Sequence, residues 1–95
     1  MDSRLRDIAI AERFGRNLWK ARRRAGFSQE ELGELTSMHR THIGYMEKGE
    51  RLPRADNLVK LASALAVGVD ELLRGIEWVV PGPNRRGSFL VDPPT

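Results

Sequence analysis

The stretch Phe27–Gly49, FSQEELGELTSMHRTHIGYMEKG, contains two short helical segments with little room between them. Ser28 is followed three residues later by Glu31, which is the sequence pattern of a capping box and predicts a helix start. Leu32 and Leu35 are the expected inward positions of this first short helix. The turn that ends it is expected near residues 36–38.

The second segment is expected to be a helix from about His39 to Glu47, stopped by Gly49. Ile43 and Met46 are its apolar positions and are expected to face the core. The other faces carry five residues with no obvious core to enter: His39, Arg40, Thr41, Gly44 and Tyr45. Two short helices joined by a tight turn form a helix-turn-helix unit. Since the major groove of DNA admits a single α-helix, this exposed face predicts contact with duplex DNA.

Apolar residues at spacings of three and four extend the helical pattern on both sides. A helix over 8–25 is predicted by Ile10, Phe14, Leu18, Ala21 and Ala25. A helix over about 55–66, after the Pro53 loop, is predicted by Leu58, Leu61, Ala62 and Leu65. Asp70 is expected to cap a short fifth helix, with Leu72 and Leu73 completing the core.

The C-terminal segment changes character, because IEWVV (76–80) and SFLVD (88–92) are β-prone and are separated by the turn-rich PGPNRRG (81–87). This pattern predicts a β-hairpin over 76–92. One of its faces is expected to carry Trp78, Val80, Phe89 and Val91. A two-stranded ribbon is marginal alone in water, so it needs cover from its own domain or from a second copy of the chain. We favour the second copy.

The chain has 95 residues, which predicts one folded domain. We expect a flexible N-terminus over 1–7, a helical domain over 8–75 and the β-prone tail over 76–95.

The sequence contains no cysteine, which suits a reducing cytoplasm. No apolar run approaches the ~20 residues of a membrane span. Charged residues interrupt the N-terminal segment, so it does not have the continuous apolar stretch of a secretory signal. We therefore expect a cytoplasmic protein with no membrane partner.

The net charge is only +3, but the basic residues are unevenly distributed. Six lie between Arg13 and Arg24 without a single acid among them: Arg13, Arg16, Lys20, Arg22, Arg23 and Arg24. Such clustering is what an electrostatic footprint for phosphate requires. It is equally compatible with a solvated helix face, and both interpretations stay open.

Catalytic and metal-binding interpretations are weaker. Glu30, Glu31 and Glu34 lack an accompanying nucleophile or phosphate-binding loop, so we expect helix-surface acids rather than an enzyme. His39 and His42 lie three apart, but without cysteine or a carboxylate cluster no metal site is expected. We expect no cofactor, and a tail of ~20 residues is too short to build a small-molecule pocket of the usual size.

The span from about residue 18 to 73 resembles the lambda-repressor/Cro (Xre-type) helix-turn-helix family. The matching motifs are RRAGFSQEELGELT (23–36), Ile43, EKG (47–49), Pro53 and LVKLASALAVGVDELL (58–73). The resemblance implies a mainly α fold: a five-helix lambda-repressor-like DNA-binding domain, here with a C-terminal β-hairpin or strand extension. The family often has glycine in the turn where this chain has Ser37, and serine tolerates that backbone conformation only with strain.

The same resemblance implies roles for matching positions. Gln29 corresponds to a residue that contacts a phosphate and braces the third helix. Arg40 and Thr41 correspond to the main base-reading positions, flanked by His39, Gly44 and Tyr45. Further backbone contacts are implied for Lys48, Arg51 and Arg54. Arg22 and Glu47 correspond to a pair that often forms a buried salt bridge.

These observations favour a sequence-specific regulator of transcription, a repressor or autoregulator, that binds an inverted-repeat operator as a homodimer. The alternative is a protein-interaction module or antitoxin-type partner that uses the same helical fold, with the tail as a docking strand for another protein. The salt dependence of the binding affinity distinguishes the two hypotheses. Phosphate contacts release counterions, so DNA binding weakens steeply with salt, whereas protein docking through an apolar hairpin does not.

Overall fold

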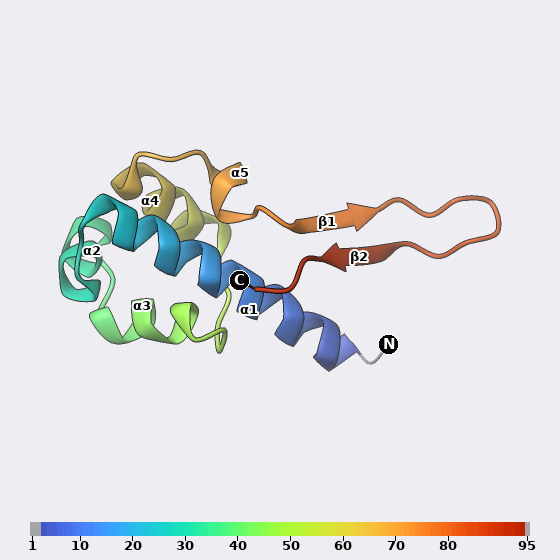
Figure 1. Ribbon diagram of the computed structural model, residues 1–95, viewed down its shortest axis with the longest axis horizontal. Helices are drawn as coiled ribbons and strands as arrows, with labels where there is room; N and C mark the ends of the chain where they lie inside the picture. The colour runs from blue at the N-terminus through green and yellow to red at the C-terminus, as the bar shows by residue number, and fades with distance from the viewer. Residues whose placement is uncertain (1–2, 95) are drawn as a thin grey trace.

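The computed structural model describes residues 3–94 and shows helices followed by a hairpin (Figure 1). The elements are α1 (Ser3–Ala25), α2 (Gln29–Thr36), α3 (Arg40–Glu47), α4 (Ala55–Leu65), α5 (Val69–Leu72), β1 (Ile76–Val79) and β2 (Ser88–Val91). The mainly helical fold with a C-terminal hairpin is confirmed. α1 begins five residues before the expected start at residue 8. Residues 1 and 2 of the predicted N-terminal segment lie outside the described residues.

The core is formed where α1 crosses the remaining helices (Figure 1). The side chains with no exposed surface come from all five helices: Phe14, Leu18, Leu32, Ile43, Met46, Leu61 and Leu72. Burial of each large apolar side chain is worth about 1.5–3 kcal/mol relative to exposure. The stripe predicted for α1 is shifted, because Ala11 is buried whereas Ala25 is exposed at the end of the helix.

Two predicted core residues and one predicted cap are wrong. Leu35 is 57% exposed, because it lies at the surface between α2 and α4, where it lines a shallow concavity with Val59. Leu73 is 37% exposed, since α5 ends at the residue before it and only Leu72 reaches the core. Asp70 lies inside α5, whose N-cap is Gly68 and carries no side-chain capping bond.

The connection between α2 and α3 is fixed by capping and by close backbone packing. Both hydrogen bonds of the capping box are present, between Ser28 and Glu31, and start α2 as predicted. Ser37 ends α2 in the left-handed conformation, at φ 56°. A Cβ atom on Gly33 would stand 2.5 Å from the Met38 carbonyl oxygen, so only glycine lets the turn fold back this tightly. This compact turn sets the position of α3.

The hairpin is antiparallel and projects from the helical body as an arm (Figure 1). Trp78 lies opposite Phe89, with ring centroids 5.1 Å apart in an edge-to-face arrangement, and Ile76 lies opposite Val91. Cross-strand partners share a face, so the predicted grouping of Trp78, Phe89 and Val91 holds. Ile76 joins them and packs on the helical core. The arm contributes to a long dimension of 48 Å, against 24 and 23 Å across.

The base of the arm is anchored by two polar side chains of α1. Arg13 Nε donates to the Arg74 carbonyl at 3.0 Å, and one of its terminal nitrogens donates to the Pro93 carbonyl at 3.0 Å. Asn17 Nδ2 donates to the carbonyls of Leu72 at 2.9 Å and Arg74 at 2.8 Å. α1 therefore connects the tail to the rest of the fold. None of the helices in the described part of the chain has the length and apolar character needed to cross a membrane.

Candidate nucleic-acid interface

α3 has one face in the core and the opposite face in solvent. Ile43 and Met46 are completely buried, whereas Arg40, Thr41 and Tyr45 are exposed. The helix starts at Arg40, one residue later than predicted, because His39 is its N-cap. The His39 Nδ1 atom accepts the Thr41 backbone N–H at 3.0 Å. The capping bond gives His39 a structural role beside the DNA contact that the resemblance implied.

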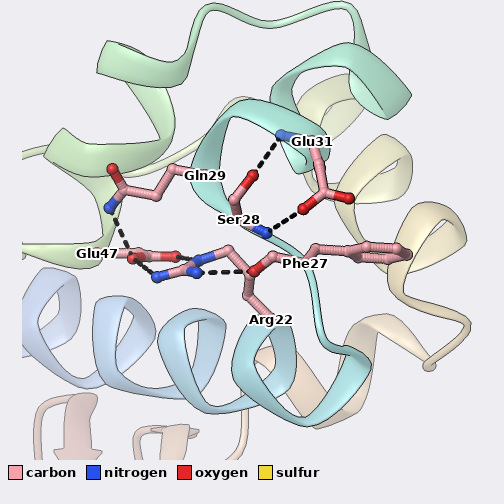
Figure 2. A network of polar contacts seen from close by, with 6 residues as sticks. All are labelled: Arg22, Phe27, Ser28, Gln29, Glu31 and Glu47. Carbon is pink, nitrogen blue, oxygen red and sulfur yellow. Dashed lines mark hydrogen bonds and ion pairs between the residues drawn. The ribbon is translucent and has the colours of Figure 1, made fainter.

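A buried polar network holds the C-terminal end of α3 (Figure 2). Arg22 Nε donates to Glu47 Oε2 at 2.6 Å, and a second guanidinium nitrogen donates to Glu47 Oε1 at 2.8 Å. The third guanidinium nitrogen donates to the Phe27 carbonyl at 2.9 Å. The side chains of the pair are only 9% and 5% exposed, so the ion pair implied by the resemblance is present and buried. The hydrogen bond to Glu47 raises the pKa of Arg22 above its ordinary value.

Gln29 extends this network to the exposed face of α3 (Figure 2). Its Nε2 atom donates to Glu47 Oε1 at 3.0 Å, so the buried ion pair fixes the orientation of the amide. Gly44 lies beside it, and a Cβ atom added there would stand 3.6 Å from Gln29 Oε1, an ordinary contact distance. The bracing role implied for Gln29 therefore has a direct geometric basis. The contact with Gln29 therefore leaves room for a larger residue than glycine at position 44.

Six of the predicted site residues line one shallow concavity over α3: Gln29, Arg40, Thr41, Gly44, Tyr45 and Lys48. We call this set the α3 surface. It combines amide, guanidinium, hydroxyl and ammonium donors on a rigid helix. Such donors are the groups that hydrogen-bond to base edges and phosphates in a DNA groove.

The exposed cations around the α3 surface have only loose partners. An Arg40 guanidinium nitrogen lies 3.7 Å from Glu30 Oε2, with both side chains about two-thirds exposed at 65% and 67%. Arg54 lies 3.7 Å from Asp56 in a similarly exposed pair. The Arg51 guanidinium lies 5.8 Å from the centre of the Tyr45 ring. Exposed pairs contribute little stability, so these cations are available to anionic ligands.

The basic run of α1 does not form a single phosphate-binding patch. Arg13 holds the hairpin, Arg22 is buried, and Arg24 pairs with Glu71 at 2.6 Å. Arg16 and Arg23 lie over the Trp19 ring, at 4.4 and 5.3 Å from its centre. Five of these six side chains therefore make intramolecular contacts, which neither of the two sequence interpretations anticipated. The distance along the chain between Arg13 and its acceptors left no local signal for this contact.

No metal-binding constellation of three or more His, Asp or Glu side chains occurs in the described part of the chain. His39 caps α3 through Nδ1, and His42 is half-buried three residues further on.

The fold and this surface define a class of DNA-binding proteins, and comparison with known proteins gives the family. Residues 20–72 match the family model described as helix-turn-helix (HTH_3). The match covers more than half of the chain, and the protein belongs to this family of lambda-repressor-like (Xre-type) DNA-binding regulators of transcription, which is not a class of enzymes. The hairpin lies beyond the matched residues.

Among curated proteins, the control protein C.SmaI of Serratia marcescens is 39% identical over 64 residues, which are 67% of this chain and 76% of that protein. Among solved structures, the restriction-modification controller protein C.AhdI of Aeromonas hydrophila superposes with a TM-score of 0.66 at 37% identity, over 68% of this chain and 94% of that one. The P22 c2 repressor in complex with a synthetic operator superposes with a TM-score of 0.62 at 29% identity, over 65% and 94%.

Proposed function

We propose that this protein is a sequence-specific regulator of transcription that binds duplex DNA through α3 in the cytoplasm. The observation that carries the proposal is the α3 surface, where exposed polar donors stand on a helix fixed from behind by the buried network of Arg22, Glu47 and Gln29. A rigid base-reading element keeps its donors at fixed spacing, which is what recognition of a particular base sequence requires.

Within the proposed complex, α3 enters the major groove. Arg40 donates two hydrogen bonds to O6 and N7 of a guanine, and Thr41 meets a neighbouring base, such as a thymine through its methyl group. His39, Gly44 and Tyr45 contact the flanking bases or the sugar-phosphate backbone. Gln29, Lys48, Arg51 and Arg54 contact phosphates on the two sides of the groove and set the register.

We propose further that two copies bind one inverted-repeat operator. A two-fold symmetric dimer presents two copies of α3 to half-sites about one helical turn apart, or a multiple of that spacing. The likeness to two controller proteins, one of them a restriction-modification controller, supports a regulator of that kind, which acts as a repressor or autoregulator. No separate ligand-binding domain is needed for such a role.

Selection from a random duplex pool by the full chain tests this proposal. We expect enrichment of an inverted repeat and an affinity that falls steeply with salt, with log K decreasing by roughly 0.9 per phosphate contact against log salt concentration. Equal and weak binding to every duplex would contradict sequence recognition. A protein-interaction module would then become the better account, and its binding would have little salt dependence.

The matched control is the variant Lys60→Ala. Lys60 is exposed on α4 and lies outside the α3 surface. Its loss removes the same single charge as a substitution at Lys48, without removing a donor that faces the proposed groove. We expect Lys48→Ala to reduce the salt slope by about one phosphate contact per protomer, and Lys60→Ala to leave the slope unchanged.

A further inference from the structure

Basic residues also lie on the side of α1 that faces away from α3. Arg22 marks the side that meets α3, because it pairs with Glu47 of that helix. The helical period of 3.6 residues per turn places Arg13, Lys20 and Arg24 on the opposite side of α1. α5 lies on that side, and α1 separates it from α3 (Figure 1). A duplex in contact with the α3 surface therefore does not account for these three cations.

The three cations line a small cavity between α1 and the segment that leads from α5 into β1, which we call the α1–α5 cavity. Its volume is about 160 Å³. The polar side chains of its lining are Arg13, Asn17, Lys20, Arg24, Glu71 and Arg74. Four of these are cationic and only one is acidic. The cavity is smaller than the roughly 300–1,000 Å³ of sites for drug-sized molecules, so it accepts a small charged group.

Hydrogen bonds hold the walls of the α1–α5 cavity in place. Arg13 Nε and Asn17 Nδ2 both donate to the Arg74 carbonyl, at 3.0 and 2.8 Å. Arg24 donates to Glu71 Oε1 at 2.6 Å, so the one carboxylate of the lining is already paired. The segment between α5 and β1 is therefore fixed against α1. A site whose walls are held in this way loses less conformational freedom when a ligand binds.

The Arg74 side chain is the cation of this cavity that has no partner in the fold. It is exposed, and no ion pair or side-chain hydrogen bond of Arg74 occurs among the residues that the structure describes. Glu71 does not offset its charge, because Glu71 pairs with Arg24. Clefts lined by one sign of charge concentrate the electric field and attract counter-ions. A planar guanidinium matches two oxygens of a phosphoryl group with two parallel hydrogen bonds.

We infer that the α1–α5 cavity binds the phosphoryl group of a small anion, at a site separate from the α3 surface. Arg74 supplies the paired donors, and Lys20 and Arg24 add positive charge from α1. Because the two sites lie on opposite sides of α1, the protein can hold the anion and DNA at the same time. The inference goes beyond the proposed function and does not rest on it, since the two sites share no residue.

Titration of the full chain with inorganic phosphate tests the inference. Phosphate replaces chloride at constant ionic strength, and two-dimensional ¹H–¹⁵N spectra follow the Asn17 side-chain amide and the backbone amides of 71–75. We expect the chemical shifts of these groups to change and to saturate as phosphate is added. Shifts that do not change, or that change linearly without saturation, would refute a phosphoryl site at this place.

Removal of the unpartnered cation gives the sharpest comparison. We expect Arg74→Gln to raise the dissociation constant for phosphate by about tenfold or more, because hydrogen bonds to a charged group are lost. Arg86→Gln is the matched control, since Arg86 is an exposed arginine in the loop between β1 and β2 and does not line the cavity. It removes the same charge and should change the dissociation constant by less than about twofold. Equal effects of the two variants would contradict the inference.

Glu71→Gln provides a readout of the opposite sign. It removes the only carboxylate of the lining and releases Arg24, so we expect the dissociation constant for phosphate to fall about two- to fivefold. Glu50→Gln is the control, because Glu50 is an exposed acid outside the cavity. Far-UV circular dichroism of every variant establishes that the helices are intact. Weaker or unchanged phosphate binding by a folded Glu71→Gln variant would also overturn the inference.

A duplex without the selected operator distinguishes a small anion from the DNA backbone as the source of the phosphoryl group. It is added to labelled protein already saturated with phosphate. We expect new shifts at the α3 surface, while those of Asn17 and 71–75 stay at their phosphate-bound values. Displacement of phosphate by the duplex, lost in Arg74→Gln, would assign the cavity to DNA and overturn small-anion binding. Failure to select any operator would remove the proposed regulator without affecting these phosphate titrations.

Discussion

Arg22 of α1 and Glu47 of α3 form a buried, two-hydrogen-bond ion pair with distances of 2.6 and 2.8 Å. The same carboxylate accepts a hydrogen bond from Gln29 of α2. Three helices thus meet at one carboxylate, directly behind the α3 surface. Because the pair is desolvated, its integrity affects both the stability of the domain and the position of α3.

Removal of one member of this pair should be costly. We expect Glu47→Ala to lower the free energy of unfolding by about 3–5 kcal/mol, because the Arg22 guanidinium stays buried without its partner. The double variant Arg22→Met/Glu47→Leu removes both charges and should lose much less. Urea unfolding followed by circular dichroism measures both. A double variant as unstable as the single one would show that packing, rather than charge compensation, dominates this site.

Two glycines of the helix-turn-helix unit should respond oppositely to alanine. Gly44→Ala places its Cβ atom at an ordinary 3.6 Å from Gln29, so the gain in helix propensity should stabilise the fold by about 1 kcal/mol. Gly33→Ala places it 2.5 Å from the Met38 carbonyl oxygen and should destabilise the fold. Thermal unfolding compares the two variants. Equal effects of the same sign would contradict the packing described for the turn.

Glu30 should oppose DNA binding through its loose pair with Arg40, 3.7 Å away. Glu30→Gln frees the guanidinium and removes a negative charge near the proposed groove, so we expect affinity for the selected operator to rise by up to about fivefold. Glu34→Gln is the control, since Glu34 is on the same helix and has no ion pair to Arg40 in the structure. Fluorescence anisotropy measures both. An equal gain from the control would assign the effect to overall charge.

The attachment of the hairpin should depend on Asn17. Its amide donates to the carbonyls of Leu72 and Arg74 at the start of the arm, and loss of each bond costs about 0.5–1.5 kcal/mol. We expect Asn17→Ala to accelerate amide hydrogen exchange in β1 and β2 roughly fivefold or more, with little change in α4. Arg23→Ala is the control on the same helix, because Arg23 contacts the Trp19 ring and not the tail. Uniform acceleration in every element would indicate global destabilisation instead.

Local patterns in the sequence were sufficient for most of the elements. The Ser28–Glu31 capping box, the apolar residues of α3 and the turn-rich segment at 81–87 each specify structure through neighbours within a few residues. The predicted hairpin and the antiparallel grouping of Trp78 with Phe89 follow from the two-residue period of strands. The motifs of 23–36 and 58–73 fixed the family and hence the place of the α3 surface.

Contacts between distant segments could not be predicted in this way. Arg13 meets acceptors 61 and 80 residues further along the chain, and its place in a basic run concealed that role. Helical spacing put Leu35 on the inward stripe, but burial of a stripe residue also depends on where the neighbouring helices lie, and Leu35 stays at the surface beside Val59 of α4. The capping role of His39 was also missed, because histidine is not among the preferred N-cap residues.

In the proposed complex with DNA, Arg40 reads a base. The most direct measurement is the affinity of the wild-type protein and of Arg40→Ala for the selected operator and for every single-base-pair variant of one half-site, at several salt concentrations. We expect Arg40→Ala to lose about 1–3 kcal/mol of discrimination at one G·C pair and to retain its preferences elsewhere. A uniform loss of affinity at every position, with a shallower salt slope and unchanged discrimination, would contradict base reading and assign Arg40 to the phosphate backbone.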